Sequence, residues 1–508
     1  MTVLQEYEAR AATSSDVVSS LPRWVWPALI LLFALALRIY HLGHESVSGD
    51  EAFSITLTRD PLGVMMHRLV LDLVHPPLHY LALRGWLGLF GFGLLPARAL
   101  SVIFGTLAVL FLYLLAEYLF DRRTALLSAL LMAISQLAIM FSQEARPYAQ
   151  MHMLAPASAY LFLRACREQR AAYWWAFVGA AVLMLYTDYF AVYLIAALLL
   201  VAIIYRDHYR LGIGWALGGA VAAIALYMPW LTSGVVQRAM QPGNVARQSA
   251  DYSAVHWWTI ASIVNSFNNG KPSGLRSDSP WWTLVVGGLL FTAPLLLLLS
   301  GFSRTANQKI GEQRDREGIV ITGILCLLPI LLTLLSGRAF HIPYNVRYVS
   351  FCAAFYYILV AWAIFELPFS ALRWGLVALI LLYSANALRA NYFLRWKEHW
   401  EPAFAYVASH RQPQDCGVFP PNLPQQQQPW EVTQGEGPPV FRLVSYESLA
   451  SGSSGCERLW EVAAAPRDDW RDWNDYKKNH DQIPPEFRKI DEQRFYAVRV
   501  SLYSRQAQ

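Results

Sequence analysis

Most of the first 390 residues alternate between apolar runs of about twenty residues and short polar stretches. A helix needs about twenty apolar residues to cross the ~30 Å hydrocarbon core of a bilayer. The pattern therefore predicts about eleven transmembrane helices. We place them at 24–40, 97–119, 124–141, 150–165, 172–187, 190–205, 211–230, 281–302, 318–336, 348–366 and 373–390.

The segment 75–93 fits a membrane span poorly. It is short, it begins with His75 and two prolines, and it carries Arg84 in its middle. These features predict an amphipathic or partly embedded helix at the membrane interface. If this segment does not cross, the basic loops fall on the N-terminal side, which the positive-inside rule assigns to the cytoplasm. The extracytoplasmic parts are then 41–96, 142–149, 231–280, 337–347 and 391–508.

The last stretch, 391–508, is a different kind of sequence, polar and without a spanning run. "EHWEPAFAYVASH" predicts a helix, "ERLWEVAAA" and "RFYAVRVSLYS" alternate like strands, and "PPNLPQQQQPWEVTQGEGPP" predicts a loop. The chain thus divides into a transmembrane domain, 1–390, and a small extracytoplasmic domain, 391–508. We expect an all-α polytopic membrane protein with a C-terminal α/β domain. Cys416 and Cys456 lie in that domain, and the sequence leaves open whether they pair.

Composition agrees with this picture. Hydrophobic residues make up 55% of the 508 residues and charged residues only 15%, whereas a soluble protein carries about 25% charged residues. The net charge of +5 is typical of membrane proteins with basic cytoplasmic loops. The apolar runs make the lipid bilayer an expected partner. The sequence has no basic stripe, so we expect no nucleic acid as a partner.

Four polar groups share the predicted outer face: Asp50-Glu51, "HPPLHY" at 75–80, "SQEARPYAQ" at 142–150 and "GRAFHIPYNVRY" at 337–348. Arg146, Arg338 and Arg347 stand there against the positive-inside trend, and the guanidinium fork suits a phosphate. A carboxylate beside a phosphate needs a task of its own. It could take a proton from an acceptor hydroxyl or hold a divalent cation.

Together these motifs resemble the GT-C superfamily of membrane glycosyltransferases, in the branch of the dolichyl-phosphate-mannose protein mannosyltransferases and the bacterial aminoarabinose transferases. The resemblance rests on Asp50-Glu51 after the first helix, "HPPLHY", "ARALSVIFGTLAVLFLYLLAEYLFDRRTALLSALLMA", "FSQEARPYA" and "NVRY". It implies a GT-C-like fold and a polyprenyl-monophosphate sugar as donor. The acceptor would be a glycan, a lipid or a protein, modified at the extracytoplasmic face of a bacterial inner membrane. The N-terminus would then be cytoplasmic.

The resemblance also implies roles for single residues. Asp50, with Glu51 beside it, would be the base that activates the acceptor, and Glu144 a second acidic group. The expected substrate-binding residues are His75, His79, Tyr80, Arg146, Tyr148, Arg338, His341, Arg347 and Tyr348. The sequence leaves open whether a divalent cation is a cofactor, and the candidate ligands are Asp50, Glu144 and His75. The protein mannosyltransferases continue His-Pro-Pro with Gly-Lys where this chain has Leu78-His79-Tyr80, so their phosphate-binding lysine is missing and Arg146, Arg338 or His79 would take its place.

Each of these residues also has a simpler interpretation. Asp50 and Glu51 could cap the next helix, Glu144 and Arg146 could form an interfacial ion pair, and Arg347 could snorkel. Asp188, in "YTDYF", is expected to be a solvated cap. The alternative function is a transporter or flippase for a lipid-linked sugar, which would place charges near the bilayer midplane. A scaffold that only presents the C-terminal domain is a third hypothesis.

Overall fold

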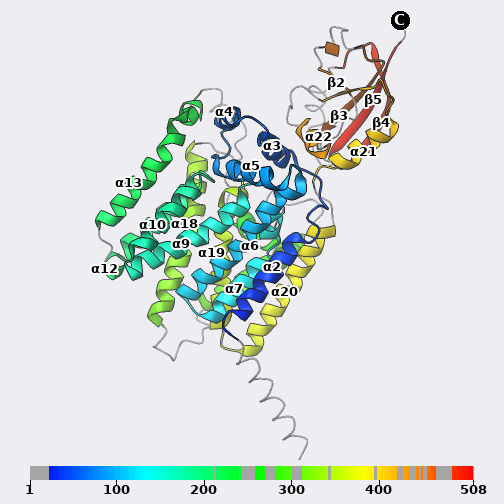
Figure 1. Ribbon diagram of the computed structural model, residues 1–508. Coiled ribbons are helices and arrows are strands. Elements are labelled where there is room, and N and C mark those ends of the chain that lie inside the picture. The colour runs from blue at the N-terminus through cyan, green and yellow to red at the C-terminus, as the bar shows by residue number, and fades with distance from the viewer. Residues whose placement is uncertain are drawn as a thin grey trace, which may run out of the picture.

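The computed structural model describes thirteen stretches of the chain. They are residues 22–209, 213–239, 241, 258–270, 281–299, 312–340, 345–393, 397–419, 427–434, 442–445, 448–449, 455–464 and 483–506. Most of these residues form a bundle of helices, and a small domain with a sheet lies at one end of it (Figure 1).

Every one of the eleven apolar segments predicted from the sequence contains helix. The corresponding helices are α2 (Val25–Ile39), α6 (Leu94–Leu119), α7 (Arg122–Ile134) with α8 (Gln136–Ser142), α9 (Tyr148–Glu168), α10 (Ala171–Leu185), α11 (Ala191–Ile204), α13 (Ile213–Trp230), α17 (Trp281–Leu299), α18 (Glu312–Phe340), α19 (Cys352–Glu366) and α20 (Ser370–Phe393). The short helix α12 (Arg206–Tyr209) lies between α11 and α13, and η1 (Leu231–Val235) and α14 (Val236–Ala239) continue α13.

Fewer of these helices are both long enough and apolar enough to cross a membrane. Within the described residues four helical stretches meet both conditions, or five if the bent pair α7–α8 is one span. The four are Leu94–Leu119, Gly218–Ala239, Arg314–Ala339 and Ser370–Phe393. Five further apolar helices have only 10–17 residues. The chain is a multi-pass helical membrane protein, but the count of eleven spans is not confirmed.

The segment predicted as one helix over 124–141 is broken at Ser135, where α7 and α8 meet at a bend of 58°. A break of this kind leaves carbonyl oxygens without helical partners. Arg38 of α2 supplies donors, because its guanidinium bonds the carbonyls of Met132 and Ala133, each across 3.3 Å. Its Nε also bonds Oγ of Ser142 across 3.1 Å. Arg38 is fully buried, so it fastens the bend to α2 from inside the bundle.

Three short helices lie at the end of the bundle nearest the small domain (Figure 1): α3 (Gly49–Leu57), α4 (Leu62–Asp72) and α5 (Leu78–Phe90). With thirteen residues, α5 is about 20 Å long and too short to cross a bilayer core. Arg84 of α5 donates to the backbone oxygens of Thr58 and Asp60, where α3 ends. The predicted interfacial helix therefore serves as a support for α3.

Helix α16 (Trp258–Asn269) was not predicted; it lies in the segment 231–280, which the sequence suggested only as an outside loop. Its Ile263 and Phe267 are buried in the main apolar core of the bundle. Tyr357 of α19 donates to the carbonyl of Phe267 across 2.6 Å. This part of the loop is thus packed into the bundle.

The small domain combines α21 (Trp400–His410) and α22 (Gln427–Gln434) with five strands. They are β1 (Cys416–Val418), β2 (Arg442–Leu443), β3 (Arg458–Ala464), β4 (Phe487–Phe495) and β5 (Val498–Arg505), in the order β2-β1-β3-β5-β4. β1 runs parallel to β2 and β3, and β5 is antiparallel to β3 and β4. A disulfide joins Cys416 and Cys456. The predicted α/β character is confirmed.

Helix α22 forms within the stretch that the sequence predicted as loop, so that prediction is wrong for 427–434. Burial explains the helix. Trp430 packs edge-on against Phe404 of α21 at 4.8 Å between ring centroids, and Val432 joins the apolar cluster of Val47 and Ala52 beside α3. The small domain is therefore packed directly onto the helix that carries Asp50.

Candidate active site

Helix α3 begins with a capping box. Its two carboxylates, Asp50 and Glu51, point in different directions. The Ser48 hydroxyl accepts from the amide of Glu51 across 3.3 Å, and the Glu51 carboxylate accepts from the amide of Ser48 across 3.2 Å. The pattern Ser-x-x-Glu is the sequence signature of this cap. Glu51 is therefore turned inward, while 53% of the Asp50 side chain remains exposed.

Asp50 faces two arginines. Its Oδ2 accepts a hydrogen bond from Nη1 of Arg347 across 2.9 Å, and Nη2 of Arg146 lies 4.0 Å from the same oxygen. The positive charge of Arg146, assisted by that of Arg347, lowers the pKa of Asp50 below its usual value. Asp50 is therefore ionised and accessible.

Glu51 is instead enclosed. Its carboxylate accepts two bonds from Arg98 of α6, at 2.8 and 2.9 Å, and one each from Lys397 at 2.8 Å and from the amide of Ala145 at 3.1 Å. Burial opposes ionisation, but the two cations keep the pKa of Glu51 well below its usual range. Because all these donors occupy a fully buried carboxylate, the geometry favours the capping interpretation for Glu51 over proton transfer.

A cationic cluster surrounds the ring of Tyr148, at the start of α9. The guanidinium carbons of Arg347 and Arg146 lie 5.6 and 5.9 Å from the ring centroid, and the His75 ring is 5.7 Å away, edge-on. His75 is buried, and neither of its ring nitrogens has a hydrogen-bond partner among the described residues. The same holds for Nε of Arg146 and of Arg347. Burial and the nearby Arg146 lower the pKa of His75 far below its usual value, so the ring is neutral.

The remaining predicted side chains line this cluster. Nη1 of Arg146 lies 3.5 Å from the Tyr80 hydroxyl and 3.2 Å from Oγ of Ser54. His79 bonds Oε1 of Gln150 across 3.3 Å, and burial lowers its pKa to about 4. Tyr348, in the short helix η3 (Val346–Val349), stacks on Phe190 at 4.3 Å and 8°. The structure thus brings together most of the predicted substrate-binding residues.

Two predicted residues, Glu144 and Arg338, lie elsewhere. Glu144 is buried and pairs with Lys397, whose Nζ is 3.3 Å from Oε1. The predicted interfacial ion pair of Glu144 with Arg146 is therefore replaced by a pair with Lys397. Arg338 lies in the last turn of α18 with an exposed side chain. His341 lies outside the described residues.

The candidate metal ligands do not converge. Asp50 is paired with arginines, Glu144 with a lysine, and His75 lies among cations. Within the part of the chain that the structure describes, no three His, Cys, Asp or Glu side chains are grouped so as to hold a metal ion. These residues do not fit a divalent cation, and no step of the mechanism below depends on one.

Sequence reasoning missed two residues of this region, Arg98 and Lys397, and was wrong about the exposure of a third, Asp188. Arg98 and Lys397 are buried partners of Glu51; the signal for Arg98 was an arginine inside an apolar run. Asp188 accepts from the amide of Phe190 across 2.8 Å, as a cap should, but it is 4% exposed and therefore not solvated as predicted. Burial raises the pKa of Asp188 to about 7.

Comparison with known proteins agrees with the motifs. Residues 74–232 match the family model described as dolichyl-phosphate-mannose-protein mannosyltransferase. That segment contains the His-Pro-Pro motif, the helices α6 to α11 and "SQEARPYAQ", but not Asp50 or Arg347. A comparison with curated protein sequences gives no significant match.

The similarity to solved structures covers nearly the whole chain. The crystal structure of ArnT from Cupriavidus metallidurans bound to undecaprenyl phosphate aligns with a TM-score of 0.61 and 12% identity, over 94% of this chain and 98% of ArnT. The apo crystal structure of the same ArnT aligns with a TM-score of 0.55 and 15% identity, over 97% and 98% of the two chains. The resemblance drawn from the motifs is confirmed, and the chain has the fold of the GT-C glycosyltransferases.

Proposed function

We propose that this chain is a glycosyltransferase that moves a sugar from a polyprenyl-monophosphate donor to an acceptor hydroxyl at the extracytoplasmic face of the membrane. The observation that carries the proposal is the half-exposed carboxylate of Asp50 beside Arg347 and Arg146. It places a base next to a cluster that can hold an anion. The undecaprenyl phosphate named for ArnT is a ligand of this chemical class.

The cluster around Tyr148 suits the donor phosphate. Arg146 and Arg347 have unbonded Nε groups, and His75 offers ring nitrogens without partners in a buried place. Buried polar groups usually have partners. Both arginine Nε groups and one nitrogen of the neutral His75 ring can donate, so these orphan groups indicate a ligand that supplies oxygens. Phosphate oxygens accept charge-assisted bonds from guanidinium groups. In this proposal His75 and Arg146 take the place of the missing lysine of the related mannosyltransferases.

The reaction is a single displacement. The acceptor oxygen attacks C1 of the sugar while the bond from C1 to the phosphate oxygen breaks, and the phosphate leaves with the electron pair. Arg146 and Arg347 stabilise the charge that grows on the leaving group. Asp50 takes the proton of the acceptor hydroxyl. Because attack and departure occur on opposite sides of C1, the anomeric centre is inverted.

The ion pair with Arg347 adds a condition to this mechanism. A carboxylate with a lowered pKa is a weak base. When the donor phosphate draws Arg347 toward itself, Asp50 loses a positive neighbour and becomes more basic. The donor therefore prepares the base that acts on the acceptor.

Two observations support the extracytoplasmic side. The disulfide Cys416–Cys456 belongs in an oxidising compartment, and the small domain that holds it packs against α3. The basic loops that follow α6, α9 and α11 lie at the other ends of their helices. A bacterial inner membrane with a cytoplasmic N-terminus fits both observations.

The test is turnover by the purified protein with radiolabelled polyprenyl-phosphate sugars and a membrane extract as acceptor. Wild type should release polyprenyl phosphate, and a folded Asp50→Asn variant should lose 10²- to 10⁴-fold in rate. Asp60→Asn, in the partly exposed ion pair with Arg68, is the matched control. Movement of the lipid-linked sugar across a vesicle without release of polyprenyl phosphate would favour a flippase instead.

A further inference from the structure

Lys397 joins two carboxylates that come from different parts of the active end. Its Nζ lies 2.8 Å from Oε2 of Glu51 and 3.3 Å from Oε1 of Glu144. The lysine is 3% exposed, so both ion pairs are shielded from water. It belongs to the connection between α20 and α21, that is, between the bundle and the C-terminal domain.

The two carboxylates belong to the segments that carry the reacting groups. Glu51 follows Asp50 on α3, and Glu144 precedes Arg146 by two residues. The amide of Ala145 donates to Oε1 of Glu51 across 3.1 Å, which ties the same two segments together a second time. Lys397 and Glu51 therefore cross-link α3 to the loop 143–147. The same two segments carry Asp50 and Arg146, whose side chains lie 4.0 Å apart.

The two carboxylates depend on Lys397 to different degrees. Glu51 also has the two bonds from Arg98 and remains paired with a cation when the lysine is removed. Among the described residues, the ion pair found for Glu144 is the one with Lys397. Removing the lysine would leave Glu144 as a buried carboxylate and release the loop that carries Arg146.

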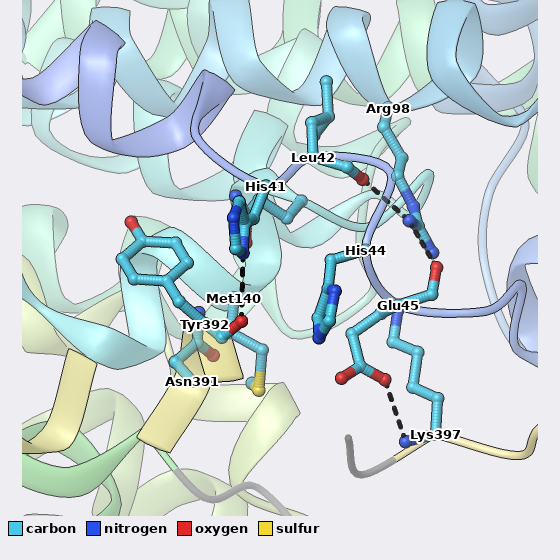
Figure 2. Close-up of a pocket in the computed structure, with 10 residues that line it drawn as sticks. His41, Leu42, His44, Glu45, Arg98, Met140, Asn391, Tyr392 and Lys397 are labelled. Carbon is cyan, nitrogen blue, oxygen red and sulfur yellow. Dashed lines mark hydrogen bonds between the residues drawn. The ribbon is translucent and has the colours of Figure 1, made fainter. Parts of the chain in front are cut away.

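Lys397 is itself held by the surrounding chain. Figure 2 shows it beside Glu45 and Arg98 in the wall of a small pocket, where the Lys397 amide donates to Oε2 of Glu45 across 3.2 Å. Four residues later, Glu401 of α21 accepts from the hydroxyl of Ser46 across 2.8 Å. These bonds fix the start of the C-terminal domain along the segment that leads into α3.

We propose that Lys397 is a positioning residue through which the C-terminal domain sets the spacing between Asp50 and Arg146. The proposal rests on the glycosyl transfer proposed above. Lys397 contacts neither donor nor acceptor and acts through Glu51 and Glu144. The domain beyond α20 is then required for catalysis because it anchors this lysine.

The cleanest test removes the cross-link without leaving a buried charge. Glu144→Gln keeps an oxygen that Lys397 can bond, and we expect its kcat to stay within about threefold of wild type. Glu144→Gln combined with Lys397→Met removes the link while Glu51 stays paired with Arg98. A displacement of about 1 Å at a reacting group can cost 10²-fold, so we expect kcat to fall at least tenfold in the double variant. Lys489→Met, an exposed lysine of β4, is the control.

Two further readouts separate positioning from a general loss of stability. Loss of Arg146 from the neighbourhood of Asp50 should raise the pKa of that carboxyl and move the acid limb of the pH–rate profile to higher pH. The charged and titratable groups around Asp50 are Glu51, Asp72, His75, Tyr80, Arg146, Tyr148 and Arg347. Hydrogen–deuterium exchange of the segment 142–149 should also become faster, because only the bond from the amide of Ala145 to Glu51 then ties this segment to α3 through Glu51.

The outcomes are distinct. A double variant with the kcat, acid limb and exchange of Glu144→Gln would overturn the proposal. An inactive Glu144→Gln with unchanged exchange would also overturn it, because Glu144 would then react directly. If wild type itself releases no polyprenyl phosphate, the proposed function fails, and the exchange measurement alone decides whether Lys397 holds the loop. The single variant Lys397→Met should show the largest kinetic loss.

Discussion

Arg347 donates a hydrogen bond to Asp50 across 2.9 Å, although the two residues are 297 positions apart in the chain. This bond closes the site between the first loop of the bundle and the short helix that precedes α19. In the proposed mechanism the donor phosphate and Asp50 compete for this one guanidinium, which would couple donor binding to the basicity of Asp50.

Replacing Arg347 should change both rate and pH dependence. Arg347→Gln removes a positive charge that lowers the pKa of Asp50, so that pKa rises and the acid limb of kcat/KM moves to higher pH. Loss of one group that stabilises the leaving phosphate should cost about 10²- to 10³-fold in kcat. The measurement is a pH–rate profile of wild type and variant. Arg494→Gln, an exposed arginine of β4, is the control, and an unshifted acid limb would show that Asp50 is not the titrating base.

Asp50 and Glu51 are adjacent, but their substitution should lower stability by very different amounts. Glu51→Gln removes the buried charge that Arg98 and Lys397 share, and breaking a buried ion pair costs about 3–5 kcal/mol. Asp50→Asn alters a half-exposed side chain and should cost no more than about 1 kcal/mol. Thermal unfolding in detergent compares the two variants. A Glu51→Gln protein that melts like wild type but is inactive would favour a role of Glu51 in proton transfer over the capping interpretation.

The sequence predicted the helices of this fold well because spanning helices need long apolar runs. It also contained the capping box at Ser48 and the arginines of the outer loops, so most of the cluster around Tyr148 could be predicted. The sequence could not show in which direction each of the two carboxylates points. Only the structure shows that the capping box turns Glu51 inward to Arg98 and leaves Asp50 beside Arg347.

The features that were missed depend on distant contacts. Nothing in "RWKEHW" marks Lys397, whose partner Glu51 lies 346 positions earlier in the chain. The break at Ser135 has no proline or glycine and is supported by Arg38 of another helix. Helix α22 forms in a Gln-rich stretch because Trp430 and Val432 find apolar surfaces on α21 and beside α3. Such interactions override local propensity.

Asp188 should make stability fall as pH rises. Its pKa is about 7 in the folded protein and near 3.8 in an unfolded chain, so between these values the folded state holds a proton that the unfolded state has released. Stability therefore declines across this window and levels off above it. Asp188→Asn cannot ionise and keeps an acceptor for the amide of Phe190. We expect the loss of melting temperature between pH 5 and pH 8 to be smaller in this variant than in wild type.

The control for this prediction is Asp207→Asn, whose side chain is 95% exposed on α12. It should show the same pH dependence as wild type. If Asp188→Asn also follows wild type, then Asp188 is ionised in the folded protein at neutral pH. Burial, with no cationic partner found among the described residues, would then not be enough to keep the Asp188 carboxyl protonated.

The attachment of α2 and α6 to the bend between α7 and α8 leaves no room for a side chain at Gly105. A Cβ atom there would lie 2.8 Å from Cβ of Ser142 and 3.0 Å from Nε of Arg38. Gly105→Ala should push Ser142 away and break its bond with Arg38, and such overpacking costs about 1–3 kcal/mol. The variant should melt at a lower temperature than wild type.

Gly179→Ala is the matched control, because a Cβ atom at this position in α10 would have nothing within 4 Å. Alanine favours a helix over glycine by up to about 1 kcal/mol, so this variant should melt at or above the temperature of wild type. Equal melting of the two variants would mean that Ser142 and Arg38 can move apart freely. The bend between α7 and α8 would then be held by the packing of its apolar side chains and not by the Arg38 guanidinium.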